Sequence, residues 1–203
     1  LKAAADANEP LVTVCSACHN VIKQTNAAMQ TDEEFAAKVN RYMAQDKDFP
    51  GEYHGEAEVL HYLELLRDKV GFDRVKEAVV NPLKGRKVAA YYGCMLLRPA
   101  KVMQMDDPEN PQIMENLIRA LGAEPVVWSE RNECCGGYIA LENEESACKK
   151  SRKVLENAKN CGADLVVTAC PLCRYNLARH SEGMPVVYFT ELLAQALGVE
   201  EEA

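Results

Sequence analysis

Five cysteines in the C-terminal half of the chain have the residue type and spacing to bind a metal cofactor. Cys94 stands alone, Cys134 and Cys135 are adjacent, and Cys170 and Cys173 form a CxxC. Thiolates are soft ligands that select zinc or iron–sulfur clusters. A zinc ribbon collects its ligands from two short loops, whereas these thiols come from three well-separated places and adjacent cysteines point their side chains apart. The spacing therefore indicates a multi-iron cluster and an iron–sulfur redox protein, with zinc as the alternative.

The residues around these cysteines favour the same interpretation. Gly136 and Gly137 follow the cysteine pair and would let backbone amides approach inorganic sulfide. Five buried thiolates repel one another, so metal charge must offset them, and we expect the loops to be locally disordered without metal. Cys148 and Cys161 lie on a predicted helical stretch and are interpreted as ordinary cysteines.

A weak internal repeat adds two further candidate ligands, Cys15 and Cys18. Residues 11–18 are a β-branched run that ends in a CxxC, and they resemble residues 166–173. Further on, residues 61–66 resemble 188–193 in the same way. No cysteine precedes Cys15, so we expect the front of the first repeat to be missing from this sequence.

Other interpretations of these residues remain open. Cys15 and Cys18 alone are also compatible with a thioredoxin-like dithiol, although the tryptophan expected beside such a motif is absent. His19 follows Cys18 and is interpreted as a packed histidine rather than a ligand. Arg98 and Arg174 flank candidate ligands, where they would offset charge, bind an anionic substrate or simply lie in solvent.

Strands and helices alternate along the second half of the chain, which predicts an α/β fold with a parallel sheet flanked by helices. In such sheets ligands sit at the carboxyl ends of the strands. Cys94, Cys170 and the loop of Cys134 and Cys135 would all reach that edge and converge there. The predicted strands are 87–92, 125–128, 165–168 and 185–189, and the predicted helices are 111–121, 142–160 and 191–197.

The region between the repeats is predicted to be mostly helical. Thr31 and Glu34 form a capping box that starts a helix to about residue 45, and a loop over 46–55 follows. Two more helices are predicted at 63–70 and 73–80. The predicted organisation is a remnant of the first repeat at 1–30, a mostly helical connector with the end of that repeat at 31–85, and a complete second repeat at 86–203.

Composition limits the class of protein. The 203 residues suffice for one large domain or two small ones, and the net charge of −8 excludes nucleic acid as the expected partner. No apolar run approaches the roughly 20 residues of a membrane helix, and no secretory signal opens the chain. Nine cysteines without an export signal predict cytoplasmic thiols available to metal rather than disulfides.

Three stretches resemble the B subunit of heterodisulfide reductase, a member of the CCG or cysteine-rich domain family. They are residues 91–99, 107–111 and 133–137. The family motif is a single cysteine, a CC pair and a CxxC, usually present twice. The resemblance spans nearly the whole chain and implies an α/β CCG-type domain.

The resemblance also implies a cofactor, an activity and partners. In the family each complete motif holds a non-cubane [4Fe–4S] cluster, and two such clusters together cleave a disulfide at an open iron site. Carried over, Cys94, Cys134, Cys135, Cys170 and Cys173 would ligate a C-terminal cluster. The partners implied are a flavin-containing subunit, a ferredoxin-like subunit and a disulfide substrate. Cys15 and Cys18 would supply the CxxC of an N-terminal cluster whose other three cysteines are absent from this sequence.

Two classes of function follow. The first is a catalytic iron–sulfur subunit of a heterodisulfide reductase-like complex. The second is a module without catalysis, either a single-cluster electron carrier or a zinc-stabilised partner-binding domain. An iron that is open to a substrate thiolate distinguishes the first class from the second.

Overall fold

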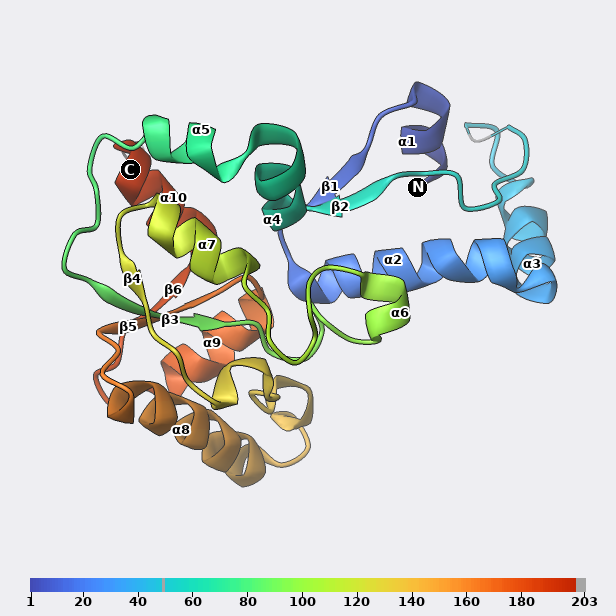
Figure 1. Ribbon diagram of the computed structural model, residues 1–203. Coiled ribbons are helices and arrows are strands. Elements are labelled where there is room, and N and C mark those ends of the chain that lie inside the picture. Colours follow the sequence, from blue (N-terminus) through green and yellow to red (C-terminus); the bar gives the residue numbers. More distant parts are fainter. Residues whose placement is uncertain (49, 200–203) are drawn as a thin grey trace.

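Four parallel strands form the larger of two sheets, in the order β4–β3–β5–β6 (Figure 1). The computed structural model describes residues 1–48 and 50–199. In the register Val88 lies opposite Leu165, and Val166 lies opposite Val186. The predicted α/β fold with a parallel sheet is therefore confirmed. The strands are β3 (Lys87–Tyr91), β4 (Glu124–Pro125), β5 (Leu165–Thr168) and β6 (Val186–Tyr188).

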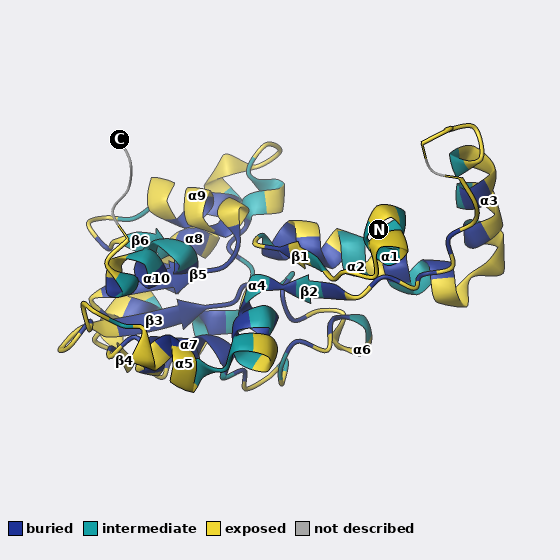
Figure 2. Ribbon diagram, turned by 90° about the horizontal axis from the view of Figure 1, so that it is seen from above, coloured by how far each residue is buried: buried dark blue, intermediate teal, exposed yellow. Residues whose placement is uncertain are grey.

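Helices cover both faces of this sheet, because successive side chains of a strand point to opposite faces. Val88 and Ala90 of β3 pack in one core cluster with α7 (Ile113–Ala120) and α10 (Phe189–Leu197). Ala89 and Tyr91 pack in the other with α8 (Glu144–Asn160) and α9 (Pro171–Arg179). Figure 2 shows the central strands buried between these layers. The carboxyl ends of β3 and β5 deliver the cysteine-bearing loops.

The N-terminal part of the chain forms a second, smaller sheet beside the first. Strands β1 (Leu11–Thr13) and β2 (Val59–His61) pair in parallel. Three helices accompany them, and α3 lies at the end of the molecule farthest from the larger sheet (Figures 1 and 2). These helices are α1 (Lys2–Ala7), α2 (Ser16–Thr31) and α3 (Glu33–Met43).

Short helical segments connect the two sheets. α4 (Tyr62–Glu64) continues directly into the π-helix η1 (Leu65–Val70), and α5 (Phe72–Glu77) follows. The loops of the larger sheet contain α6 (Ala100–Met103) and two 3-10 turns, η2 (Glu130–Asn132) and η3 (Gly137–Ile139). Within residues 1–48 and 50–199, no helix is long and apolar enough to cross a membrane.

Most predicted elements of the second half are present, but the strand predicted at 125–128 is wrong beyond Pro125. After one more backbone hydrogen bond, from Val126 to Val88, the indole nitrogen of Trp128 donates to the carbonyl of Ala90 at 3.1 Å. A side chain thus takes the place of the next backbone partner. Val127 then faces solvent, with 83% of its surface exposed, so it does not pack on either face of the sheet.

The capping box predicted at Thr31 is also wrong. Thr31 is the last residue of α2, and Asp32 caps α3 by accepting the amide of Phe35 at 2.9 Å. Within the loop predicted at 46–55, Phe49 lies outside the described residues, and the others form turns, bends and irregular chain. The sequence analysis did not predict α2 and α9, the two helices that follow the CxxC motifs. The three-part division of the chain stays a prediction.

Candidate functional site

The five C-terminal cysteines meet at the carboxyl edge of the larger sheet. Cys94 follows β3, Cys170 ends the loop after β5, and Cys173 lies in the first turn of α9. The sulfurs of Cys135 and Cys173 are 3.5 Å apart. The thiols of Cys135 and Cys94 are near enough to Cys134 to shift its pKa, and the thiol of Cys170 does the same to Cys173. The five sulfurs therefore form one continuous row of neighbours.

These contacts make the pKa values of the five thiols unequal, lowering those of Cys134 and Cys170 and raising those of the other three. Hydrogen bonds from the thiols of Cys135 and Cys94 lower the pKa of Cys134. The Cys173 thiol and nearby backbone amides lower the pKa of Cys170 to about 6. The contact with Cys134 raises the pKa of Cys94, and the contact with Cys135 raises that of Cys173. Thiolate is thus favoured at some positions only, and a cation is needed to hold all five as thiolates.

Backbone groups come close to the sulfurs. The amide of Gly136 donates to the Cys134 sulfur at 3.4 Å, and the amide of Gly137 donates to the Cys135 sulfur at 3.3 Å. Gly93 has a φ of +64°, and a Cβ at this position would lie 3.2 Å from the Cys173 sulfur. These amides are placed to stabilise sulfur charge, as they do around bound clusters.

Two polar side chains that the sequence analysis missed hold the loop of Cys134 and Cys135. The carbonyl of Cys135 accepts the Ser151 hydroxyl at 3.0 Å and the Asn176 amide at 2.7 Å. Asn176 also donates to the Ser151 hydroxyl at 2.9 Å, and both residues are buried. They come from α8 and α9, so neither has a sequence signal that links it to the cysteine pair.

A buried ion pair supports the end of β3 that leads to Cys94. The carbonyl of Arg131 accepts the amides of Tyr92 and Gly93 at 2.7 and 3.2 Å. The Arg131 guanidinium pairs with Glu115 at 2.7 Å, and the Tyr92 hydroxyl donates to the same carboxylate. Both charged side chains are at least 90% buried. The loops of Cys94 and of the cysteine pair are thereby joined through Arg131.

The N-terminal CxxC lies directly beside the C-terminal one. Cys15 caps α2 by accepting the amide of Cys18 at 3.2 Å. The amide and hydroxyl of Ser16 both donate to the carbonyl of Ala169, at 3.0 and 2.7 Å. The backbone amide of Ala17 helps to lower the pKa of Cys170. Both CxxC helices therefore direct their N-terminal amides at the same group of sulfurs, where helix dipoles favour negative charge.

The Tyr188 side chain links the two CxxC loops. Its hydroxyl contacts the carbonyls of Val14 and Ala169, each of which directly precedes the first cysteine of a CxxC. Burial raises the pKa of Tyr188, and the thiolate charge of Cys15 raises it further. All seven predicted cysteines are thus gathered in one region, although whether they bind metal stays a prediction.

The other candidate residues have ordinary environments. Cys161 is exposed at the end of α8, and Cys148 is half-buried on that helix. His19 is fully buried, with its Nδ1 3.0 Å from the Thr13 hydroxyl, and burial lowers its pKa to about 4. It is therefore a packed histidine. The guanidinium groups named as possible anion sites are both paired with carboxylates, Arg98 with Glu109 and Arg174 with Glu191.

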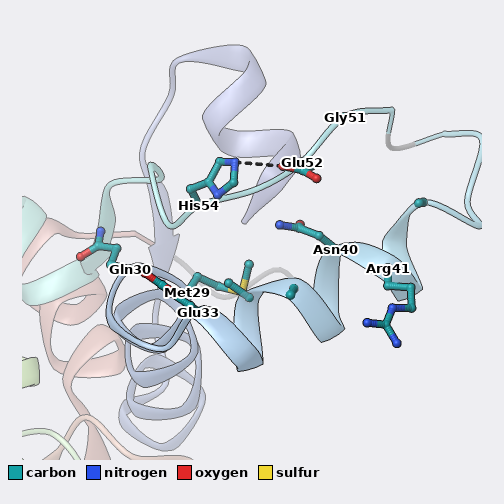
Figure 3. A pocket seen from close by; sticks show the side chains of 11 residues that line it. Met29, Gln30, Glu33, Asn40, Arg41, Gly51, Glu52 and His54 are labelled. Atoms are coloured by element: carbon teal, nitrogen blue, oxygen red, sulfur yellow. Dashed lines mark ion pairs between the residues drawn. The ribbon is translucent and has the colours of Figure 1, made fainter.

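Two hollows in the surface differ in their relation to the cysteines. One of about 660 Å³ lies between α3 and the loop of Glu52 and His54, and no cysteine lines it (Figure 3). Its Glu52 and His54 form an exposed ion pair at 3.4 Å. The other, of about 470 Å³, is lined by Tyr188 and by α9 residues such as Pro171 and Arg174. The first touches α2 only at Met29 and Gln30, far from Cys18, whereas Pro171 of the second lies between Cys170 and Cys173.

The donor set fits a cofactor that binds several thiolates at once. In the part of the chain that the structure describes, no three His, Cys, Asp or Glu side chains form a site for a metal ion as they stand. A single tetrahedral ion takes four ligands, whereas five neighbouring cysteines are available here. Five soft donors, with backbone amides directed at several of them, suit a multi-metal cluster better than one tetrahedral ion.

Comparisons with known proteins identify relatives over most of the chain. A family profile described as "Cysteine-rich domain" (CCG) matches residues 88–178. The 8-methylmenaquinol:fumarate reductase membrane anchor subunit of Wolinella succinogenes is 33% identical over 95% of this chain and 69% of its own. A protein of Archaeoglobus profundus, named for its likeness to the B subunit of heterodisulfide reductase, is 31% identical over 95% of this chain and 68% of its own.

A heterodisulfide reductase subunit and a solved structure are also similar to this chain. The B subunit of the ferredoxin/F420H2-dependent CoB–CoM heterodisulfide reductase of Methanosarcina acetivorans is 32% identical over 93% of this chain and 65% of its own. The chain thus spans about two thirds of the length of these curated relatives. A hypothetical protein from Helicobacter pylori has a similar fold, with a TM-score of 0.62 at 12% identity over 87% of this chain and 32% of its own.

Proposed function

Because the chain belongs to the cysteine-rich (CCG) domain family that includes the heterodisulfide reductase B subunits, we propose that it is an iron–sulfur subunit of a reductase complex that reduces a disulfide to two thiols. The observation that carries this proposal is the continuous row of five thiols. The sulfurs of Cys135 and Cys173, near the middle of this row, are 3.5 Å apart. Three separate loops converge to build it.

The chain's own residues would hold the cofactor. Cys94, Cys134, Cys135, Cys170 and Cys173 are the proposed ligands of a non-cubane [4Fe–4S] cluster. The amides of Gly136 and Gly137 stabilise charge on their thiolates. A bound cluster would supply single electrons and an iron site open to a thiolate. Zinc remains the alternative metal for these thiols.

Reduction of a disulfide consumes two electrons and two protons and releases two thiols. A cluster passes electrons on but is not their source, so we propose that they come from other subunits, one flavin-containing and one ferredoxin-like. Cys15 and Cys18 are the proposed CxxC of a second cluster. Their contact with the Cys170 loop through Ser16 would place that cluster beside the first.

A second candidate function is electron transfer without substrate binding. A relative of similar identity is named as a subunit of a menaquinol:fumarate reductase, which is not a disulfide reductase by name. In such a module the cluster would be fully ligated and would only pass electrons. The two candidates differ in whether a thiol reaches the metal.

The experiment that tests the proposal is metal analysis of anaerobically prepared protein, followed by EPR. Iron, zinc and acid-labile sulfide are measured first, and spectra are then recorded with an oxidant, with and without a small thiol such as 2-mercaptoethanol. Near-equal iron and sulfide, with a spectrum changed by the thiol, is the expected result. Iron and sulfide with an unchanged spectrum would instead favour electron transfer, and zinc without sulfide would refute an iron–sulfur function.

A further inference from the structure

One buried side chain of the N-terminal repeat reaches across to the loop that carries Cys94. Asn20 lies on α2, two residues after Cys18, and is 1% exposed. Its amide nitrogen donates to the carbonyls of Met95 and Arg98, at 2.7 and 2.6 Å. Its oxygen accepts the amide of Gln24 at 2.6 Å. The amide nitrogen also lies 3.4 Å from the Met103 sulfur, but its two shorter contacts are both with one loop of the other repeat.

That loop is a single turn, and its Leu96 and Leu97 side chains are buried in the core. The amide of Arg98 donates to the carbonyl of Cys94 at 3.2 Å, which closes the turn. The carbonyls of Met95 and Arg98 have no backbone donor within the turn, as is usual for carbonyls at the end of a helical turn. They therefore need a hydrogen-bond donor from outside it. Asn20 supplies that partner, and its removal would leave two partly buried carbonyls without this donor.

We infer that Asn20 is a positioning residue for Cys94 and couples the N-terminal CxxC helix to the C-terminal cysteine row. Cys94 is the one cysteine of the row that belongs to neither a pair nor a CxxC. The sulfur of Cys94 contacts Cys134, and its place in the row depends on the turn that follows it. Asn20 fixes that turn from a helix whose N-terminal amides already face the row.

The structure also offers a matched control on the same helix. Asn26 is likewise buried, at 8% exposed, and its amide donates to the carbonyl of Ala57 at 3.1 Å. That hydrogen bond holds the loop before β2 and does not involve a cysteine-bearing loop. Asn26→Ala should therefore cost stability as Asn20→Ala does, without affecting Cys94.

The first test measures thiol reactivity in the metal-free chain. Wild type, Asn20→Ala and Asn26→Ala are treated with iodoacetamide, and alkylation of each cysteine is followed by peptide mass spectrometry. We expect Cys94 to react about tenfold faster in Asn20→Ala, because two hydrogen bonds that hold its turn are lost. The exposed Cys161 should react equally in all three proteins. Equal rates for Cys94 in the two variants would overturn the inference.

If Asn20→Ala does not fold, a second variant, Asn20→Asp, can be used in the same alkylation test. Asn20→Asp has the same size but lacks both donors, so it should raise the reactivity of Cys94 in the same direction. Reactivities are compared at a temperature where each variant is folded by circular dichroism. An Asn20→Asp protein with wild-type reactivity at Cys94 would refute the positioning role.

The second test uses the cluster and rests on the proposed function. After reconstitution with iron and sulfide, Asn20→Ala should retain less iron and show shifted EPR lines, whereas Asn26→Ala should match the wild type. Unshifted EPR lines in Asn20→Ala would mean that the side chain only stabilises the fold. If the wild type takes up no iron and sulfide, the proposed function fails, while the alkylation rates still decide the inference.

Discussion

His19 and Arg174 occupy equivalent positions in the two repeats, each directly after the second cysteine of a CxxC and each beside the glutamate that caps a later helix. His19 Nε2 lies 3.4 Å from Glu64, and Arg174 lies 2.7 Å from Glu191. Each glutamate also accepts a helix-cap amide at 2.7 Å, from His61 and from Tyr188 respectively. The repeat seen weakly in the sequence therefore extends to side-chain contacts.

The two glutamates differ in burial, and this difference predicts unequal costs of removal. Glu64 is 4% exposed and also pairs with Lys23 at 3.3 Å, whereas the Glu191 side chain is 38% exposed. Glu64→Ala should lower the free energy of unfolding by about 2–3 kcal/mol, because buried partners lose their acceptor. Glu191→Ala should cost about 1 kcal/mol or less. Urea unfolding of both variants checks this, and equal losses would contradict it.

Substitution of single cysteines tests the proposed ligands. Cys134→Ser should abolish the reconstituted cluster, because Cys134 lies between Cys94 and Cys135 in the row. Cys148→Ser, half-buried on α8, should retain the iron and sulfide of the wild type. The measurement is iron and sulfide per chain after anaerobic reconstitution. Equal retention in the two variants would remove the basis of the assignment.

The glycine after the cysteine pair should not tolerate a side chain. Gly136 has a φ of +84°, and a Cβ there would lie 2.9 Å from the Cα of Ala147. Gly162 has the same φ with nothing within 4 Å, so it shares the backbone strain without the clash. Gly162→Ala should cost about 1–2 kcal/mol of stability, and Gly136→Ala more than that, with loss of iron. Thermal unfolding and iron content are the readouts, and similar behaviour of the two variants would count against a tightly packed loop.

Breaking the buried ion pair beneath Cys94 should be costly. Arg131→Met leaves Glu115 buried and without its partner, which typically costs about 3–5 kcal/mol. Lys149→Met removes an exposed ion pair with Glu145 and should cost under about 0.5 kcal/mol. Denaturant unfolding of the two variants and the wild type measures both losses in the free energy of unfolding. A loss below about 1 kcal/mol for Arg131→Met would show that the pair does not support this end of β3.

Stability should fall with acid partly through His61. This side chain is fully buried, and burial lowers its pKa from 6.5 to about 3. Between these pH values His61 is therefore protonated in the unfolded chain and neutral in the folded chain. The stability contribution is therefore present above pH 6.5 and declines toward pH 3, by about 1.4 kcal/mol per pH unit. His61→Asn keeps a cap acceptor for the Leu63 amide and should flatten this slope.

The exposed His54 provides the control for this pH dependence. Its side chain is 61% exposed, so His54→Asn should leave the slope of stability between pH 6.5 and 4 unchanged. Free energies of unfolding, measured at several pH values in this range for the wild type and both variants, show whether His61 contributes to the slope. A His61→Asn slope equal to that of the wild type would mean that His61 is protonated in the folded chain.

The cysteine pattern and the alternation of strands and helices are enough to predict the fold class and the candidate residues. β-branched runs such as residues 165–168 specify buried parallel strands, and the edge rule for such sheets predicts that the loops after them meet. The repeat is visible for the same reason, since the strand and CxxC recur in order. These are local patterns, and local patterns can be read from one sequence.

Tertiary structure decided which distant side chains hold the candidate site together. Asn20, Asn176 and the Arg131–Glu115 pair act on loops of the site that lie far from them in sequence, through hydrogen bonds that no spacing rule predicts. The short β4 has a similar origin, because the Trp128 indole takes the Ala90 carbonyl. The sequence by itself determined which residues could bind metal. Their position relative to one another depended on long-range packing, since buried polar groups must find partners wherever the fold brings them.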